Sequence, residues 1–598
     1  MPKRIALALL CAIGFIVYLP ALRAGFVWDD RALVLTDPLI RSWQLSWEGF
    51  QHFLFVDAGG SDFYRPLQRL SYLIDYAIFA FAPMGYHFVS VFWHTAAAVA
   101  FFFFAEELLR FSEMSTTRRA WLAFLAALIW LVHPVQSAAV AYIAGRADPL
   151  AAAFGFLALF LGLRMLRATR ERSLGWAIGL GFCLLASALS KEMGLLFLAL
   201  WLIIVFARGH CSEFWRALAI VVPVLALYLS LRVPAEHFTK PPNEHATSSL
   251  AQPILIARAA AEYAGLLIFP LHLHMDRDVQ THAAGFAESG PEAAAWRELQ
   301  TLLGLAVIAG TLYAVWRARR QPAVFLPLLL GLVSYLPVSG LVRLNATVAE
   351  HWLYLPSAFL FLGAVAAADS LGIFQRRTAQ ICLTTWLIFL PLRAYVRNGD
   401  WKDQRTFLER TIASGGDSAR MFINLGGLEL SEGHLKAARR DLEAALAREP
   451  GNPLALLNLG AVAIKQRDFA QARSTLQKVT ASPELEARAQ ESLSVLEERE
   501  NGRVNLLRLR MAAHLGAPNW SIEKRYLMAL ADLGFPERAI AELRTCLSLA
   551  PYRAESWATM SELLQCIGRP NEAAIALAEA RADDVHLRGL AVADNGHR

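Results

Sequence analysis

Long apolar runs are the feature of this sequence that most limits how the chain can fold. About eleven runs approach the 17–25 residues that a membrane-spanning helix needs. They begin near Ile5, Tyr86, Ala120, Leu150, Leu174, Met193, Arg216, Leu299, Ala323, Trp352 and Ala379. The whole chain is 56% apolar and only 18% charged, which is too apolar for an ordinary soluble protein. We therefore predict an all-α fold that begins with a polytopic membrane bundle of about eleven spans.

Clusters of basic residues give the expected orientation of this bundle. Five clusters lie between the runs, at 110–119, 164–172, 208–216, 317–320 and 376–377. Positively charged loops stay in the cytoplasm, so these clusters and the N-terminus are predicted to be cytoplasmic.

Two further apolar segments, 70–81 and 254–269, are short or carry charges, and we expect them at the surface or as re-entrant segments. Before Trp28 there is no convincing cleavage site of a signal peptide, so the first run is expected to be a retained anchor. The predicted membrane is the inner membrane of a bacterium, with outer loops at 23–85 and 233–298.

The composition changes sharply after Arg397, where the chain becomes charged, rich in Ala and Leu, and helical in period. The alanines Ala438, Ala472, Ala539 and Ala573 are separated by 34, 67 and 34 residues. A period of 34 residues is typical of tetratricopeptide repeats, which stack into an α-solenoid. We predict a membrane domain at 1–398 and an extracytoplasmic repeat domain at 399–598. A disulfide between Cys546 and Cys566 is conceivable there, because that compartment is oxidising.

The predicted orientation collects the polar groups of the membrane domain at its outer face. Asp29 and Asp30 follow the first apolar run, and Arg65 lies about 35 residues further on. Carboxylates near a bilayer cost desolvation energy unless they are solvated or paired. Two interpretations fit Asp29 and Asp30 equally well: a catalytic pair, or a helix end that faces water.

Other polar residues at this face also have two interpretations. Arg146 either snorkels to the membrane boundary or binds a phosphate with its planar guanidinium. Lys191 and Glu192 form either a self-compensating turn or a second cationic site.

The histidines are more ambiguous. His87 and His94 share a helix face and fit a hydrogen-bonded core better than a metal site. The trio His272, His274 and Asp276 has the spacing of a metal site on a strand, although a solvated loop fits better.

Six motifs in order then carry a resemblance to a known family. They are VWDD, YRPL, GYHxVxxxxH, HPVxSxAVAYIAGRAD, SKE and EHWLYLPS, and the repeats follow them. This order resembles the TMTC family and its bacterial relatives, within the GT-C superfamily of polyprenyl-phosphate-sugar-dependent glycosyltransferases. The chain departs from the animal members in its short repeat array and in His351, where an arginine is common.

The resemblance implies an inverting transfer of a sugar, such as mannose, from a polyprenyl phosphate to an acceptor hydroxyl. Asp29 or Asp30 matches the position of the general base, and Arg65, Arg146 and Lys191 are the candidates for holding the donor phosphate. Supporting roles are expected for His133, Asp148, Glu192, Glu350 and Tyr354. No metal ligand and no certain cofactor is assigned, although a divalent metal fits the chemistry.

The expected partners are the lipid-linked sugar, the bilayer and a protein acceptor recruited by the repeats. Nucleic acid is not expected, because the net charge is only +6 and no basic-aromatic patch is present. Two alternatives stay open: a non-catalytic membrane scaffold that displays the repeats, and an enzyme with a lipid or glycan acceptor.

Overall fold

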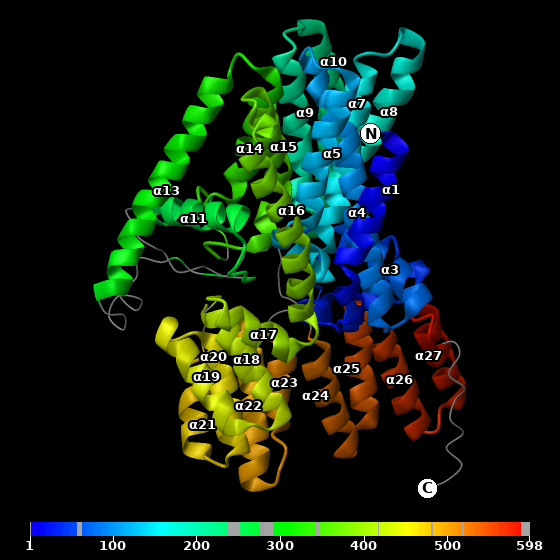
Figure 1. Cartoon of the computed structure of the whole chain (residues 1–598). Helices are drawn as coiled ribbons and strands as arrows, with labels where there is room; N and C mark the ends of the chain where they lie inside the picture. Colours follow the sequence, from blue (N-terminus) through cyan, green and yellow to red (C-terminus); the bar gives the residue numbers. More distant parts are fainter. Residues whose placement is uncertain are drawn as a thin grey trace. The chain divides into compact units, whose positions relative to one another are not determined.

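The computed structural model shows an α-helical protein (Figure 1). It describes residues 2–587 except 57–62, 237–251, 276, 278, 280–290, 343, 345, 417, 480–481 and 516–518. Among these residues the only β-structure is an isolated bridge between Arg277 and Val348. The chain divides into two compact units. The first comprises Met1–Asp30, Ala82–Leu231 and His245–Asp417, and the second comprises Arg31–Phe81, Arg232–Glu244 and Ser418–Arg598.

The first unit is a bundle of long apolar helices. Its helices are α1 (Lys3–Val17), α4 (Pro83–Leu108), α5 (Thr116–Val132), α7 (Ala147–Met165), α8 (Arg170–Ser190), α9 (Leu196–Ala207), most of α10 (Cys211–Glu236), α11 (Gln252–Ile268), α13 (Pro291–Ala318), α14 (Pro322–Tyr335), α15 (Tyr354–Ser370) and α16 (Arg377–Asn398). Packed aromatic rings fill its centre. Phe156 of α7 lies 4.9 Å from Phe101 and 5.4 Å from Phe197 between ring centroids. A β-carbon at Gly155 would overlap the Phe197 ring, so this glycine permits the close approach of α7 and α9.

Seven of these helices are long and apolar enough to cross a membrane, namely α4, α7, α8, α10, α13, α15 and α16. An eighth span results if α5 and the segment Pro134–Val140 count together, although the two are bent by 54°. The prediction of a polytopic bundle of apolar helices is therefore confirmed. The sequence predicted eleven membrane spans, whereas the described residues contain seven, or eight with the bent pair.

The difference comes from α1, α9 and α14, which have 15, 12 and 14 residues. Part of each of these three runs forms a 3₁₀ turn instead of α-helix: Leu19–Arg23 follows α1, Glu192–Leu195 precedes α9, and Leu336–Val338 follows α14. Average hydropathy does not register such breaks. The segments 70–81 and 254–269 form α3 (Pro66–Phe79) and α11, and neither is among the seven spans.

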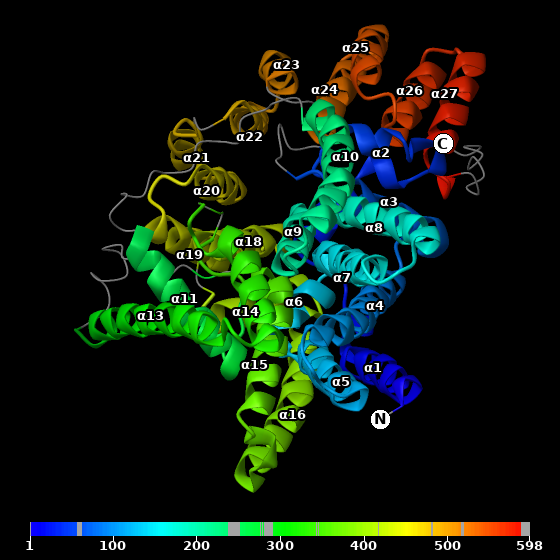
Figure 2. The ribbon, with the colours of Figure 1, turned by 90° about the horizontal axis from the view of Figure 1, so that it is seen from above.

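The second unit contains paired helices that follow one another along an arc (Figure 2). They are α18 (Ala419–Glu432), α19 (Leu435–Arg448), α20 (Pro453–Lys465), α21 (Phe469–Leu476), α22 (Pro483–Asn501), α23 (Leu506–His514), α24 (Trp520–Asp532), α25 (Pro536–Leu549), α26 (Ala554–Cys566) and α27 (Pro570–Asp583). The four periodic alanines are all buried, at most 1% exposed. Small side chains at these positions allow paired helices to pack closely, as the period predicted.

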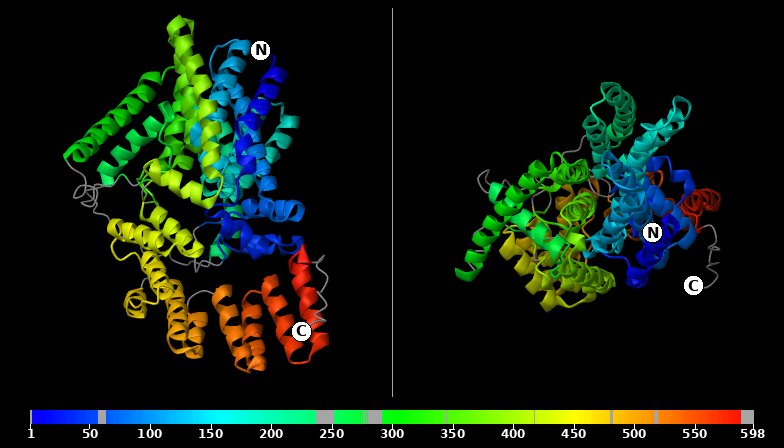
Figure 3. Two further views of the ribbon diagram at one scale, coloured as in Figure 1. Left: turned by 60° about the horizontal axis from the view of Figure 1, so that its bottom comes forward. Right: turned by 45° about the horizontal axis from the view of Figure 1, so that its top comes forward.

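The same unit includes the segment between α1 and α4, which packs against the end of the repeats (Figure 3). The Tyr76 hydroxyl donates to both carboxylate oxygens of Asp584, at 2.9 and 3.1 Å. The guanidinium of Arg41 lies 4.4 Å from the Tyr76 ring centroid, and Tyr552 is buried beside Leu39. The compact units thus differ from the two consecutive domains expected from composition, because residues 31–81 pack with the repeats.

Arg69 of α3 holds the folded segment 31–81 together. Its side chain forms an ion pair with Asp37 at 3.0 Å and donates to the carbonyl oxygens of Gly49, His52, Phe53 and Leu54. Only 2% of Arg69 is exposed, and these acceptors satisfy its planar donors. No sequence motif distinguishes Arg69, although it lies one helical turn after Arg65.

The conceivable disulfide in the repeats is absent from the structure. Cys546 is a half-buried free thiol and Cys566 is an exposed one. They lie late in α25 and at the end of α26, so the adjacency of these helices does not bring the two sulfur atoms into a bond.

Candidate functional site

The two adjacent aspartates that follow α1 have different environments. Asp30 is completely buried, and its two carboxylate oxygens accept hydrogen bonds from the backbone N–H groups of Val27 at 3.0 Å and Ala144 at 2.7 Å. Asp29 is half-buried, and its backbone N–H donates to the Tyr142 hydroxyl at 3.1 Å. Asp30 therefore joins the first loop to the loop before α7, whereas Asp29 retains access to solvent.

Burial raises the pKa of the Asp30 carboxyl to about 8, although the two N–H donors oppose this effect. A pKa near neutral suits a general base. However, both oxygens of Asp30 are already engaged and the side chain is fully enclosed. Asp29 is thus the better placed of the two for contact with a substrate.

Arg146 is buried beneath the same loops. Its Nε donates to Ser90 Oγ at 3.1 Å, and Nη2 donates to the Tyr86 carbonyl at 2.6 Å, so it joins the start of α7 to α4. Its positive charge lowers the pKa of Asp30, whose carboxylate accepts from the N–H of Ala144, two residues before Arg146. The Arg146 side chain is buried inside the protein and does not extend to the surface as a snorkelling arginine would.

Lys191 and Asp148, two further predicted site residues, form an ion pair. Lys191 Nζ lies 2.7 Å from both carboxylate oxygens of Asp148, and both side chains are about nine-tenths buried. Lys191 thus pairs with Asp148 of α7, a partner that the adjacent Lys-Glu sequence did not indicate. Glu192 is half-buried at the start of a 3₁₀ turn.

His133 and Tyr354 serve the packing of the bundle. His133 Nδ1 accepts from the Val135 N–H at 3.3 Å, and Nε2 donates to the Leu267 carbonyl at 3.1 Å. The Tyr354 hydroxyl is 2.7 Å from His94 Nδ1, and both residues are buried. His94 is a hydrogen-bonded core residue, as its helical spacing with His87 predicted. His87 is also buried, with Nε2 at 3.4 Å from the Gly25 carbonyl.

Glu350 is fully buried and forms an ion pair with Arg397 of α16, at 2.7 Å. Arg397 also contacts Asp400 at 3.0 Å and is itself 1% exposed. In the sequence, Arg397 is notable only as the last residue before the composition changes. In the structure its guanidinium is the ion-pair partner of Glu350.

Arg65 belongs to the second compact unit, whereas the other predicted site residues belong to the first. It precedes α3, is partly exposed, and its guanidinium is 4.7 Å from the Phe63 ring centroid. Its predicted contact with a donor phosphate stays a prediction.

The histidine trio expected near residue 274 has no strand geometry in the described residues. His272 is exposed, whereas His274 is buried and its Nε2 lies 3.4 Å from Glu262 Oε1. Asp276 lies outside the described residues. The alternation of a strand does not hold here, so the two histidines do not present a common face.

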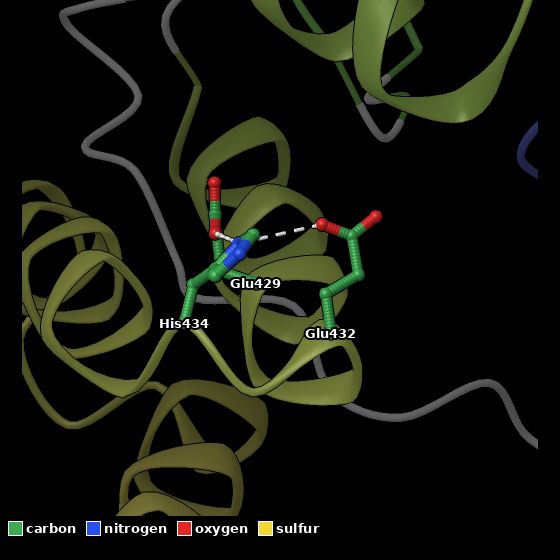
Figure 4. A group of neighbouring side chains, drawn as sticks. All are labelled: Glu429, Glu432 and His434. Carbon is green, nitrogen blue, oxygen red and sulfur yellow. Dashed lines mark hydrogen bonds and ion pairs between the residues drawn. The ribbon is translucent and has the colours of Figure 1, made fainter.

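A different trio, Glu429, Glu432 and His434, brings ligand atoms of the metal-binding kind together at the end of α18 (Figure 4). His434 Nδ1 is 2.8 Å from Glu429 and 3.5 Å from Glu432. A histidine at a helix C-terminus with carboxylate partners is a common ion-pair arrangement. The geometry does not require a metal.

Comparison with known proteins places these features in context. Residues 392–453 and 429–495 match two models described as Tetratricopeptide repeat. Over 456 residues the chain is 27% identical to Protein O-mannosyl-transferase F38B6.6 of Caenorhabditis elegans, a match that covers 74% of this chain and 63% of that protein. It is 34% identical over 194 residues to Protein O-mannosyl-transferase TMTC2 of Mus musculus, covering 31% and 22%. The chain is similar to the TMTC proteins.

The chain spans less than two thirds of the length of either relative. Among solved structures, the crystal structure of ArnT from Cupriavidus metallidurans bound to undecaprenyl phosphate aligns with a TM-score of 0.36 and 13% identity. That alignment covers 83% of this chain and 77% of ArnT. The predicted resemblance to the TMTC family and the predicted repeats are thus confirmed.

Proposed function

We propose that this protein is a membrane glycosyltransferase that transfers a sugar from a polyprenyl phosphate to an acceptor hydroxyl, with Asp29 as the general base. The relatives are named protein O-mannosyl-transferases, which makes mannose the first sugar to test. The observation that carries the proposal is the contrast between the aspartates: Asp30 is enclosed and bonded through both oxygens, whereas Asp29 is partly exposed beside it.

The reaction is a single displacement at the anomeric carbon. The Asp29 carboxylate accepts the proton of the acceptor hydroxyl while the hydroxyl oxygen bonds to the anomeric carbon. The bond between that carbon and the phosphate oxygen breaks, and the polyprenyl phosphate leaves with the electron pair. The configuration at the anomeric carbon inverts, and charge builds up on the phosphate, where cations stabilise it.

Arg65, Arg146 and Lys191 remain our candidates for this electrostatic role. The ion pair of Lys191 with Asp148 adds a condition, because a donor phosphate must compete with the Asp148 carboxylate for the same ammonium. The Nε and Nη2 groups of Arg146 already donate to α4, so we expect Arg146 to act through its positive charge, which also lowers the pKa of Asp30. His133, Glu192, Glu350 and Tyr354 would support the site by positioning the helix ends around it.

The test is sugar transfer by the full-length protein in liposomes, with radiolabelled polyprenyl-phosphate mannose as donor. Peptides with Ser and Thr, a lipid and a glycan are offered as acceptors, with and without EDTA to test for a metal. Label in a peptide supports the proposal, and label only in lipid or glycan supports the alternative acceptor. If no donor and acceptor pair gives product, the scaffold function is favoured instead.

The repeats are proposed to recruit the protein acceptor through a groove between α25, α26 and α27. It is lined by Arg544, Leu547, Ser548, Trp557, Met560, Leu564, Glu572, Ile575 and Ala576. Exposed apolar side chains beside charged ones suit an amphipathic peptide. Deleting the repeats is not a clean test, because the packing of Tyr76 against Asp584 would be lost with them.

The substitution Ile575→Ser tests this groove. Ile575 is 64% exposed, so its loss should leave the fold intact but weaken an apolar peptide contact, reducing kcat/KM for a protein acceptor by about tenfold. Transfer to a small acceptor should not change. Leu507→Ser is the matched control, because Leu507 is 70% exposed in α23 and does not line the groove. Equal effects of the two substitutions would contradict recruitment at this site.

The proposed orientation predicts which positions a membrane-impermeant thiol reagent can reach. Single cysteines at Ser431, Thr169 and Gln321 are all at exposed positions, so protein packing does not decide their reactivity. In intact cells, and with the exposed native cysteines replaced, Ser431→Cys should react, whereas Thr169→Cys and Gln321→Cys should react only after permeabilisation. Reaction of the last two in intact cells would overturn the orientation.

A further inference from the structure

Four aromatic rings pack against one another beside Asp29. Ring centroids of Trp28 and Tyr142 are 6.4 Å apart, and those of Tyr142 and Trp401 are 5.2 Å apart. Trp401 stacks on Phe407 at 4.7 Å, and Phe407 lies 5.4 Å from Trp28. The rings come from the first outer loop, the loop before α7, the 3₁₀ turn Gly399–Trp401 and α17 (Gln404–Ala413), all within the first compact unit.

Trp28 has a left-handed backbone conformation, with φ of 50°. Such a conformation is unfavourable for a bulky residue and persists only where its surroundings impose it. Here the Trp28 N–H donates to Gln404 Oε1 at 2.6 Å, and the Gly25 N–H donates to the Lys402 carbonyl at 2.9 Å. Residues 402–404 thus fix the backbone that leads directly into Asp29.

Tyr142 fixes Asp29 from the other side. Its hydroxyl accepts the Asp29 N–H at 3.1 Å and also forms a hydrogen bond with the Asp29 side chain. Burial, followed by the two neighbouring carboxylates, raises the pKa of the Tyr142 hydroxyl well above its ordinary value. Tyr142 therefore keeps its proton and can donate it in a hydrogen bond to the Asp29 carboxylate.

We propose that Tyr142 and Gln404 are positioning residues that hold Asp29 for proton abstraction. The inference rests on the proposed function, and it adds a link to the repeats. Gln404 and Phe407 lie within the segment 392–453 that matches a tetratricopeptide repeat model. The backbone that leads into Asp29 is thus held by a segment that continues into the repeats.

The first test is the pH dependence of kcat/KM for Tyr142→Phe, which keeps the stacked ring and removes the hydroxyl. A hydroxyl that donates to a carboxylate favours its charged form, so its removal should raise the pKa of Asp29. The acid limb of the profile should move to higher pH by about one unit. Other charged or titratable groups on the segments around this loop include Asp30, Arg31, His87, Arg146, Asp400, Lys402 and Asp403, and the substitution changes none of them.

The control is Tyr18→Phe, which also removes a buried hydroxyl, bonded to the Leu131 carbonyl at 3.4 Å. Its acid limb should coincide with that of the unsubstituted protein. If Tyr142→Phe is too slow to profile, the titration of Asp29 is followed by NMR of ¹³C-labelled aspartate, assigned with Asp29→Asn. A midpoint unchanged in Tyr142→Phe overturns the role of Tyr142.

The second test compares two substitutions of Gln404. Gln404→Leu removes the acceptor of the Trp28 N–H and should lower kcat by about tenfold or more with little change in KM, because it displaces the base. Gln404→Glu keeps an acceptor oxygen and should restore kcat. If both variants match the unsubstituted protein, Gln404 is not a positioning residue. Failure of the proposed function is recognised separately, because Asp29→Asn would then transfer as fast as the unsubstituted protein.

Discussion

Replacing Asp29 by asparagine is expected to slow sugar transfer by about 10²–10⁴-fold, the usual cost of losing a positioned general base. Asparagine keeps the volume of the side chain and removes only its ability to accept a proton. Asp29 is half-exposed, so the fold should tolerate the change. The measurement is kcat with the labelled donor at saturating acceptor, together with the midpoint of thermal unfolding in detergent.

Asp30→Asn is the matched comparison, and its expected result differs. An asparagine amide nitrogen cannot accept a hydrogen bond, so either the Val27 or the Ala144 N–H would lose its acceptor in a fully buried place. Thermal stability should fall together with activity. Transfer by Asp29→Asn at the unsubstituted rate would refute Asp29 as the base. A stable but inactive Asp30→Asn would then assign the base to Asp30.

Much of the fold could be predicted because its determinants are periodic. The apolar runs predict the long helices, and the regularly spaced alanines such as Ala438 and Ala573 predict the repeats, without any tertiary information. The ends of the helices could not be predicted as well, because local breaks such as the one at Pro134 leave the average hydropathy high. The packing of residues 31–81 against the last repeat has no periodic signal, since it depends on single contacts such as Tyr76 with Asp584.

The candidate site was predictable in its residue types and less so in their partners. The motifs indicated Asp29, Asp30, Arg146, Lys191 and Asp148, and the structure brings the first three into one pair of loops. Sequence alone could not distinguish Asp29 from Asp30, because the difference lies in two backbone donors. Tyr142 is part of a motif already noted, whereas Gln404 lies beyond the composition change and carries no motif that would have indicated it.

The second large effect is expected at the ion pair between Arg397 and Glu350. Arg397→Met should lower the free energy of unfolding by about 3–5 kcal/mol, because it leaves a buried carboxylate without its counter-charge. Glu350 is 0% exposed, and its second oxygen has no hydrogen-bond partner among the described residues. The basic side chains of His274 and Arg393 also act on Glu350, but neither forms an ion pair with it, so we expect them to offset only part of the loss. Asp400 loses the same cation at 3.0 Å. The measurement is unfolding in detergent by heat or denaturant.

The ion pair of Arg118 with Asp369 gives the control. Its atoms are 2.8 Å apart, nearly the same separation as in the buried pair, but the Arg118 side chain is 51% exposed. Arg118→Met should therefore cost only about 0–1 kcal/mol, since water replaces the lost partner. The double substitution Arg397→Met with Glu350→Gln should recover part of the stability, because it removes the uncompensated charge. If Arg397→Met costs no more than Arg118→Met, water reaches Glu350, and the pair does not join α16 to the turn before α15 in the way that its burial indicates.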